Sequence, residues 1–268
     1  MIALQILSDI HLEAFEGYNN FEITPRASRL ALLGDIGCFG KDFEEYTDFL
    51  LARLRQFKIV FLVLGNHEPY HSSWAEVKTL AKDFQKGLEA QKEYGENLGD
   101  FVLLDQTRFD IDEGEDRITV LGCTLFSKVP SESHDAVSFG LNDFFYIENW
   151  DVKKHNEEHQ RDVQWLNTQV QALEGSGRKV VVLTHFNPTR DTRAQDPRHR
   201  NSSITSGFAT NLQKEPVWQS KSVKLWAFGH THFNCDFTDG HGKRIYANQR
   251  GPFFGQSTGF DVSAVVNL

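Results

Sequence analysis

Cysteine is scarce in this chain of 268 residues, and long apolar stretches are absent from it. Its three cysteines, Cys38, Cys123 and Cys235, are well separated and none lies in a Cys-x-x-Cys pair, so they do not predict a disulfide framework. Such cysteine usage is typical of reducing compartments. The longest apolar runs, such as residues 59–64, have strand length and fall far short of the roughly 18 residues of a membrane span.

A signal peptide is not predicted either. The first residues, Met-Ile-Ala-Leu-Gln-Ile-Leu-Ser-Asp, contain neither a positively charged region nor a small-residue cleavage site, both of which secretion signals have. Repeats, low-complexity tracts and long linkers are absent as well. We therefore predict a cytoplasmic protein without a membrane partner.

The chain has fewer basic than acidic residues, 28 Lys and Arg against 37 Asp and Glu, which gives a net charge of −9. Binding along a nucleic-acid backbone needs clustered Lys and Arg, so no extended nucleic-acid partner is expected. A small phosphorylated substrate remains compatible with this charge if a metal neutralises the phosphate. The apolar fraction of 40% and the charged fraction of 24% are those of an ordinary globular protein.

The order of apolar patterns predicts the fold class. Short apolar runs closed by Gly or Asp indicate strands covered on both faces. The predicted strands are residues 2–8, 30–33, 59–64, 101–104, 117–126, 179–183 and 223–228, a hairpin over 235–248 and a last strand over 262–266. Helical spacing predicts helices over 42–57, 73–94 and 157–174. Two strand-helix halves in series predict an α/β fold, with two stacked mixed β-sheets flanked by helices, in a single domain over 1–268.

Polar residues directly follow five of the predicted strands. They are Asp9, His11, Asp35, Asn66, His67, His185, His230 and His232. Each alone admits a simple structural role as a loop histidine or a turn residue. Together they would meet at one edge, because ligands in open α/β sheets bind beyond the carboxyl ends of the strands. Carboxylate, amide and imidazole donors in this number suit two divalent metals.

Five motifs carry these residues, namely SDIH, LLGDI, LGNHE, LTHF and FGHTH. In their order and spacing the chain resembles the calcineurin-like metallophosphoesterase superfamily over nearly its whole length. The resemblance implies an α/β/β/α sandwich and a pair of metal sites. One metal would be held by Asp9, His11 and His232. The other would be held by Asn66, His185 and His230, and the bridging ligand would be Asp35. The metals would be two divalent or transition metal ions, either Mn²⁺, Fe, Zn²⁺ or a mixed pair.

The same resemblance implies a mechanism in which metal-activated hydroxide attacks phosphorus in line with the leaving group. His67 is not expected to bind metal. It would give a proton to the leaving oxygen or stabilise the charge that builds there as a cation. Glu68 would orient a histidine of the metal shell.

Differences from the motifs of known subfamilies reduce the number of candidate substrate classes. After Asp35, protein serine/threonine phosphatases carry Asp-x-Val-Asp-Arg-Gly, which brings a basic phosphate clamp, whereas this chain reads Asp-Ile-Gly-Cys-Phe-Gly. Purple acid phosphatases have tyrosine where Cys38 stands. The pattern is most similar to small cytosolic members that act on phosphodiesters. We therefore predict a phosphodiesterase, with nucleotides or cyclic nucleotides among its candidate substrates. The alternative is a phosphomonoesterase acting on a small metabolite, and a non-catalytic scaffold or a nuclease is less favoured.

Substrate contacts are expected in two insertions, residues 127–156 and 187–220. Phe144 and Tyr146 could stack on a flat substrate group, although simple packing of the loop is the favoured explanation of such aromatics. Arg190 and Arg250 could bind phosphate, or could belong to solvated loops. His155 and His159, one helical turn apart, could form a third metal site, but an ordinary helix start is favoured.

Overall fold

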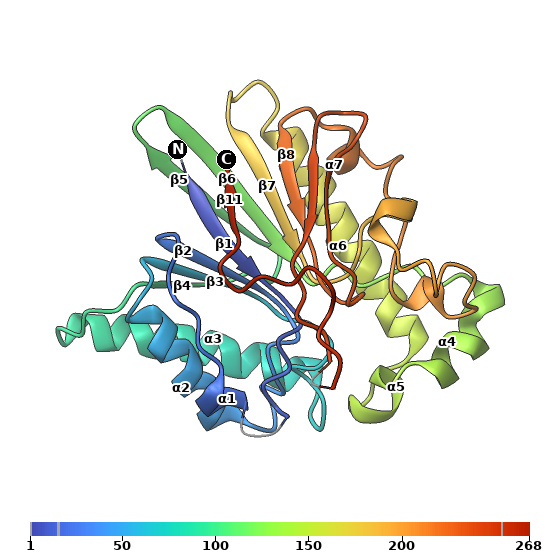
Figure 1. Ribbon diagram of the computed structural model, residues 1–268, viewed down its shortest axis with the longest axis horizontal. Helices are drawn as coiled ribbons and strands as arrows, with labels where there is room; N and C mark the ends of the chain where they lie inside the picture. The colour runs from blue at the N-terminus through green and yellow to red at the C-terminus, as the bar shows by residue number, and fades with distance from the viewer. Residues whose placement is uncertain (1, 15–16, 253) are drawn as a thin grey trace.

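Two β-sheets lie face to face between helices in the computed structural model, which describes residues 2–14, 17–252 and 254–268 (Figure 1). The first sheet has the order β11-β1-β2-β3-β4 and the second the order β5-β6-β7-β8-β10-β9. The strands of the first sheet are β1 (Ala3–Leu7), β2 (Arg29–Leu33), β3 (Ile59–Val63), β4 (Asp100–Leu103) and β11 (Val265–Asn267). Those of the second are β5 (Thr107–Glu113), β6 (Asp116–Cys123), β7 (Lys179–Thr184), β8 (Val223–Ala227), β9 (Cys235–Thr238) and β10 (Arg244–Ala247). The predicted fold class is therefore confirmed.

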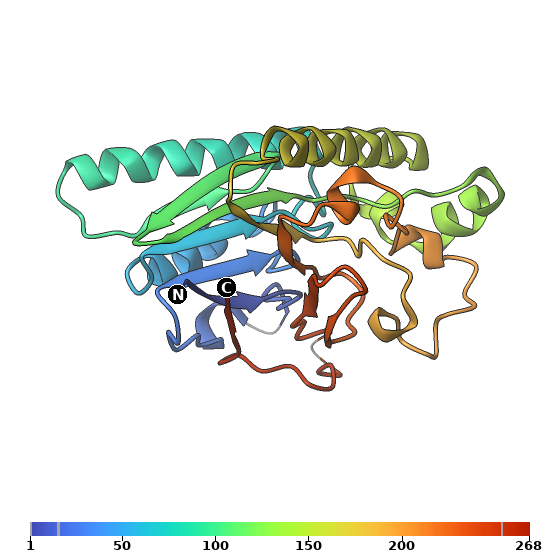
Figure 2. The ribbon, with the colours of Figure 1, turned by 90° about the horizontal axis from the view of Figure 1, so that it is seen from above.

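Antiparallel strands lie at three of the four sheet edges, and the strands between them are parallel. β11 is antiparallel to β1, β5 to β6 and β9 to β10. The pairing of β1 with β11 places the two ends of the chain beside each other, as Figure 2 shows. The inner strands run parallel, so their carboxyl ends reach the same edge of each sheet.

The outer faces of the sheets are covered by helices α2 (Phe43–Leu54), α3 (Trp74–Glu93) and α6 (Val152–Ala172). The other helices are α1 (Gly17–Asn20), α4 (His134–Gly140), α5 (Asp143–Tyr146) and α7 (Pro216–Gln219). Figure 1 shows α2 and α3 along the first sheet and α6 along the second. None of the helices in the described ranges combines the length and the apolar character needed to cross a membrane.

The side-chain alternation of β-strands divides the core into layers. In β3, Phe61 and Val63 belong to the cluster between the two sheets, whereas Val60 and Leu62 pack with the helices on the outer side. All four are buried, which is why the strand reads as one continuous apolar run. This double coverage makes the strand ends rigid supports for the loops that follow them.

Predicted and observed elements differ most at β5 and at the start of α6, and the strand predicted over 262–266 is Val265–Asn267. β5 was not expected, because this edge strand reads Thr-Arg-Phe-Asp-Ile-Asp-Glu and buries only Ile111 fully. Helix α6 begins at Val152, five residues before the predicted start, because Asp151 caps it by accepting a hydrogen bond from the Lys154 N–H. By contrast, Ser73 caps α3 as predicted, accepting from the Glu76 N–H.

The early start of α6 gives His155 and His159 structural roles. The Ser127 N–H donates to Nε2 of His155 at 3.1 Å, and Nδ1 of His159 contacts the Leu125 carbonyl at 2.9 Å. Both histidines therefore hold the segment after β6 against α6. The favoured interpretation, a helix start rather than a third metal site, agrees with these contacts.

Burial of His155 predicts a loss of stability in acid. Burial and the neighbouring His159 lower the pKa of His155 to about 3, against about 6.5 in an unfolded chain. The stabilisation from this group is thus complete above pH 6.5 and is lost as the pH falls toward 3. Urea unfolding of His155→Gln should show a stability that falls less steeply below pH 6.5, by up to about 1.4 kcal/mol per pH unit. The exposed His241→Gln variant should keep the parent slope, and an unchanged slope in His155→Gln would contradict the assignment.

Candidate metal centre

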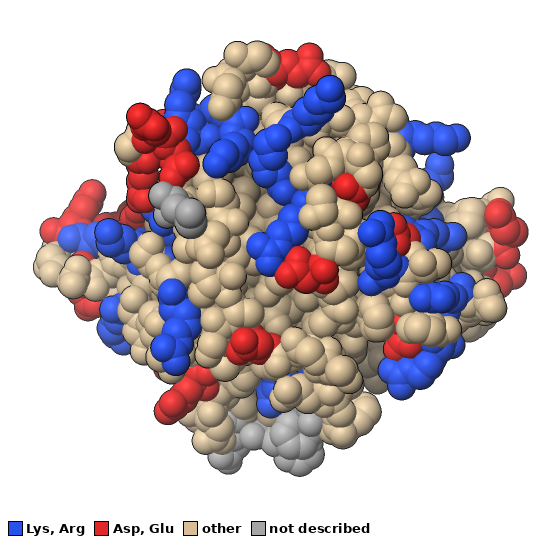
Figure 3. All heavy atoms as spheres, turned by 45° about the horizontal axis from the view of Figure 1, so that its top comes forward, with Lys and Arg blue, Asp and Glu red and all other residues tan. Residues whose placement is uncertain are grey.

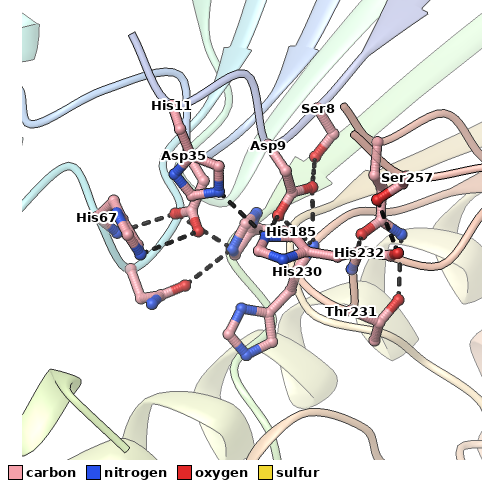
Figure 4. Close-up of polar contacts among 12 residues, drawn as sticks. Ser8, Asp9, His11, Asp35, His67, His185, His230, Thr231, His232 and Ser257 are labelled. Atoms are coloured by element: carbon pink, nitrogen blue, oxygen red, sulfur yellow. Dashed lines mark hydrogen bonds and ion pairs between the residues drawn. The ribbon is translucent and has the colours of Figure 1, made fainter. Parts of the chain in front are cut away.

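The polar residues predicted from the sequence meet where strands of both sheets end (Figure 4). Asp9 and His11 follow β1, Asp35 follows β2, and Asn66 and His67 follow β3. From the second sheet, His185 follows β7, and His230 and His232 follow β8. The site therefore spans the seam between the two sheets, and neither sheet could form it alone.

Among the described residues, three groups of three side chains are close enough to hold a metal ion. They are Asp9, His11 and His232, then Asp35, His185 and His230, and lastly His11, Glu13 and His67, which shares His11 with the first group. In the first group, Nε2 of His11 lies 3.0 Å from Nε2 of His232, which in turn lies 3.4 Å from Oδ1 of Asp9. In the second group, Nε2 of His185 lies 3.4 Å from Oδ1 of Asp35. Oδ1 of Asn66 joins the second group, 3.0 Å from Nε2 of His185.

Several of these residues have strained backbones. The φ angles are 51° at Asp9, 54° at His11, 52° at Asp35, 71° at His230 and 50° at His232. This left-handed conformation costs a non-glycine residue roughly 1–2 kcal/mol. Such strain persists only where the surrounding structure imposes it, and it clusters at functional sites. The turns therefore aim carboxylates and imidazoles into one space at a cost in stability.

Glycines in three of the motifs allow the loops to approach closely. A Cβ atom on Gly65 would lie 2.3 Å from Oδ1 of Asp35, and one on Gly229 would lie 2.6 Å from Oδ2 of Asp9. Gly34 combines a φ of 85° with close contact to His185. The glycines beside the polar residues are thus required by packing at the site as well as by turn geometry.

Hydrogen bonds orient the donor atoms toward the centre. Nδ1 of His185 contacts the Leu33 carbonyl at 2.7 Å, which leaves Nε2 free to bind metal. Both oxygens of Asp9 accept from the His230 N–H, and Oδ2 of Asp9 also accepts from Ser8 Oγ at 2.5 Å. Gln249 Oε1 accepts from the His232 N–H.

The donor set fits a pair of metals. Nε2 of His230 is buried and has no hydrogen-bond partner within residues 2–14, 17–252 and 254–268, although buried polar atoms are rarely left unpaired. Burial raises the pKa of Asp35, but His185 and His67 outweigh it and hold that pKa well below its usual range. Ionised carboxylates and an unpaired imidazole nitrogen are what divalent transition metals bind.

Glu13, which sequence reasoning missed, joins two histidines of the site. Its Oε1 lies 2.9 Å from Nδ1 of His67 and 3.2 Å from Nδ1 of His11. Burial raises the pKa of Glu13, but the two histidines lower it to about 2. The carboxylate therefore orients both rings, turning Nε2 of His67 toward Asp35 Oδ2 at 3.8 Å. Its place two residues after His11 was the signal available in the sequence.

Asp143 is a second residue that sequence reasoning missed. It lies at the start of α5 and is buried. Its Oδ1 accepts from Nδ2 of Asn66 at 2.8 Å and from the Tyr70 hydroxyl at 2.7 Å. The first bond turns Oδ1 of Asn66 toward His185. Tyr70 in turn stacks on the His67 ring, with centroids 4.3 Å apart, so α5 supports both residues of the Asn-His pair.

Glu68 does not orient a histidine, and this prediction was wrong. Its carboxylate accepts from the backbone N–H groups of Asp35, Ile36 and Gly65 at 2.7–3.0 Å and from the Tyr46 hydroxyl at 2.9 Å. Glu68 thus joins the loop after β2 to the loop after β3. The physical reason is that these turns leave backbone donors unpaired in a buried place.

The four residues expected to contact substrate lie at different places around the site. Arg250 donates to the Ile10 carbonyl at 2.8 Å and covers the Phe21 ring. Arg190 donates to the Ala209 carbonyl at 3.3 Å. Phe144 packs beside the small cluster around Val137, whereas Tyr146 is 45% exposed and lies 5.4 Å from the Tyr70 ring. A role for them in substrate binding stays a prediction.

The remaining arginines of the basic segment are also engaged within the chain. Arg193 pairs with Asp191 and Arg198 with Asp196, both through two hydrogen bonds or more. Arg200 donates to the Thr192 carbonyl at 2.8 Å. The sequence suggested a basic island beside the site, but the acidic residues interleaved in it neutralise two of its charges.

Removing the Glu68 carboxylate should destabilise the fold. Glu68→Ala leaves three buried N–H groups without an acceptor, at about 1–3 kcal/mol each, so we expect a loss of about 3–5 kcal/mol in urea unfolding. Measuring it on EDTA-treated protein removes any contribution from bound metal. The exposed Glu89→Ala variant on α3 should change stability by less than about 0.5 kcal/mol. A loss of the same size in both variants would refute the role of Glu68.

Comparison with known proteins agrees with this geometry. An uncharacterized protein of Acanthamoeba polyphaga mimivirus is 26% identical over 94% of this chain and 91% of its own length. Among solved structures, a phosphopantetheinyl hydrolase from Mycobacterium tuberculosis has a TM-score of 0.67 at 16% identity, covering 93% of this chain and 89% of its own. A dimetal phosphatase from Danio rerio has a TM-score of 0.50 at 15% identity, covering 92% and 86%. The family model of calcineurin-like phosphoesterases matches residues 5–234. The chain therefore belongs to the calcineurin-like phosphoesterase family, whose members are metal-dependent phosphoester hydrolases.

Proposed function

We propose that this protein hydrolyses a phosphodiester on a small substrate with the help of two metal ions. The observation that carries the proposal is the pair of clusters, Asp9-His11-His232 and Asp35-His185-His230, that face each other beside His67. When bound, two divalent metals stabilise the phosphoryl oxygens and make water a nucleophile at neutral pH. Asp9, His11 and His232 would hold one ion. Asn66, His185 and His230 would hold the other, with Asp35 between them.

His67 is the proposed proton donor to the leaving oxygen. Its Nδ1 is engaged by Glu13, so Nε2 is the atom that faces the centre. Burial lowers the pKa of His67, but Asp35 and Glu13 raise it to about 9, and Glu13, which is not a proposed metal ligand, would go on favouring a protonated ring beside bound metals. An alkoxide is a poor leaving group unless it is protonated as the bond to phosphorus breaks.

Charge favours a diester over a monoester. A monoester is a dianion at neutral pH and gains most from a cationic clamp, whereas a diester carries one negative charge. The two arginines expected near the phosphate donate instead to backbone carbonyls, and Phe39 stands where the pattern of protein serine/threonine phosphatases has its arginine. A phosphomonoesterase is the second candidate, supported by the neighbour named as a dimetal phosphatase.

The surface gives little support to a nuclease or to any extended nucleic-acid partner. Figure 3 shows acidic side chains sharing one face with the basic ones. The net charge of −9 would oppose binding along a phosphate backbone. We therefore propose a small phosphorylated substrate, and a cytoplasmic location remains a prediction from the cysteine usage and the N-terminal sequence.

Asp35→Asn tests the metal centre. Losing the proposed bridging charge should lower the metal content from about two ions per chain. It should also lower kcat/KM on bis-p-nitrophenyl phosphate with Mn²⁺ by at least about 100-fold. This is the largest loss typical for substitution of a residue that only supports a metal ligand. Metal is measured by elemental analysis of purified protein. Asp83→Asn, at a site 63% exposed on α3, is the control and should keep both values.

Two outcomes would overturn the proposal: wild-type protein that retains no metal, or full activity in Asp35→Asn. Comparison of bis-p-nitrophenyl phosphate with p-nitrophenyl phosphate decides between the candidates. We expect at least a tenfold higher kcat/KM for the diester, about 1.4 kcal/mol in barrier. The reverse order would favour the monoesterase.

Glu13→Gln tests proton donation by His67. The neutral amide no longer favours a protonated ring, so kcat should fall by about 10- to 100-fold on a phenyl ester and much less on the matching p-nitrophenyl ester. The reason is that p-nitrophenolate leaves without protonation. The exposed Glu44→Gln variant is the control. Equal losses on the two esters would mean that Glu13 only supports His11.

A further inference from the structure

A groove of about 1080 Å³ opens beside the metal centre and has no role in the mechanism above. Two of the metal-centre histidines, His230 and His232, line it. One wall comes from residues 195–209 and the other from residues 254–258. Its volume is at the upper end for small-molecule sites, and it is far larger than a phosphate group requires.

The groove and the proposed proton donor lie on different sides of the centre. The His11 ring is 4.5 Å from the His67 ring and 5.1 Å from the His232 ring. Figure 4 shows His67 at one end of the cluster and His232 with Thr231 and Ser257 at the other. A leaving group next to His67 therefore points away from the groove, and the groove is open to another substituent on phosphorus.

Most polar side chains of the groove are already engaged. Asn234 donates to the carbonyls of Gln249 and Thr258, and its own oxygen accepts from the Gln249 N–H. Ser257 donates to the His232 carbonyl, and Thr205 to the carbonyls of His199 and Ser202. These bonds shape the walls, but they leave the hydroxyls and the amide little capacity for a ligand.

Two charges in the groove are paired with each other, and a third is bound to the backbone. Arg198 and Asp196 form an ion pair at 2.6 Å, and the Arg200 guanidinium donates to the Thr192 carbonyl. The apolar side chains that line the groove can still contact a ligand. They include Ile204, Phe208, Phe233 and Phe254. Phe254 is 91% exposed, so a ligand that covers its ring would remove apolar area from water.

We propose that this groove binds the ester substituent that stays on phosphorus, and that this substituent is uncharged and predominantly apolar. The proposal rests on the proposed phosphodiesterase function and names the substrate class of the same site. Water contributes the oxygen that bonds to phosphorus, the bond to the leaving oxygen breaks, and His67 supplies that oxygen with a proton. The products are a free alcohol and the phosphomonoester of the group in the groove.

A series of p-nitrophenyl phosphodiesters tests this assignment, because the leaving group stays constant while the second substituent is methyl, octyl, choline or a nucleoside. With Mn²⁺-loaded protein, we expect kcat/KM for the octyl ester to exceed that for the methyl ester by at least about tenfold. The choline and nucleoside esters should fall below the octyl ester. Phe254→Ala should lower kcat/KM for the octyl ester by about three- to tenfold. It should not change kcat/KM for the methyl ester. Phe139→Ala, at a site 79% exposed on α4 and outside the groove, is the matched control.

Calorimetric binding of octyl phosphate and methyl phosphate separates this proposal from the proposed function. Hydrolysis with equal kcat/KM for all second substituents, or a preference for a charged one, overturns the groove assignment and leaves the hydrolase intact. No hydrolysis of any ester overturns the proposed function. In that case the groove is a binding site for an apolar phosphate ester, without hydrolysis, if octyl phosphate binds more tightly than methyl phosphate and Phe254→Ala abolishes the difference; equal binding refutes an apolar site as well.

Discussion

One carboxylate, that of Glu68, holds together the two loops on which the metal centre depends. It collects the backbone N–H groups of Asp35, Ile36 and Gly65 in a place that water does not reach. Without this acceptor the turns after β2 and β3 would bury unpaired donors, and the positions of Asp35 and Asn66 would no longer be fixed relative to each other. The site is therefore supported by a residue that need not touch metal or substrate.

The remaining supports work in the same way, since several side chains at the centre are oriented by a second group behind them. Glu13 aligns His11 and His67, Asp143 aligns Asn66, and the Leu33 carbonyl aligns His185. These contacts come from different segments, so the geometry exists only once both sheets are packed. Left-handed backbone at five of the polar residues shows that local conformational energy is sacrificed for this arrangement. Rigid, doubly covered strands make such strain tolerable.

Much of the fold and of the centre could be predicted from local patterns. Buried parallel strands read as continuous apolar runs, and the polar residue after each one marks the edge where ligands collect. β5 escaped prediction because an edge strand with one buried side chain has little apolar signal. The start of α6 was misplaced because its cap, Asp151, precedes a polar first turn rather than an apolar one.

The sequence by itself determined the fold class, the family and the set of polar residues at the strand ends, because these depend on periodicity and on short motifs. Only the tertiary structure decided what Glu13, Glu68 and Asp143 do, since their partners lie 32 to 77 residues away along the chain in most contacts. It also decided that two arginines of the basic segment pair with carboxylates while two donate to backbone carbonyls, and that a largely apolar groove adjoins the centre. Packing between distant segments decides which side chains are in contact. Local sequence patterns do not predict contacts between residues so far apart in the chain.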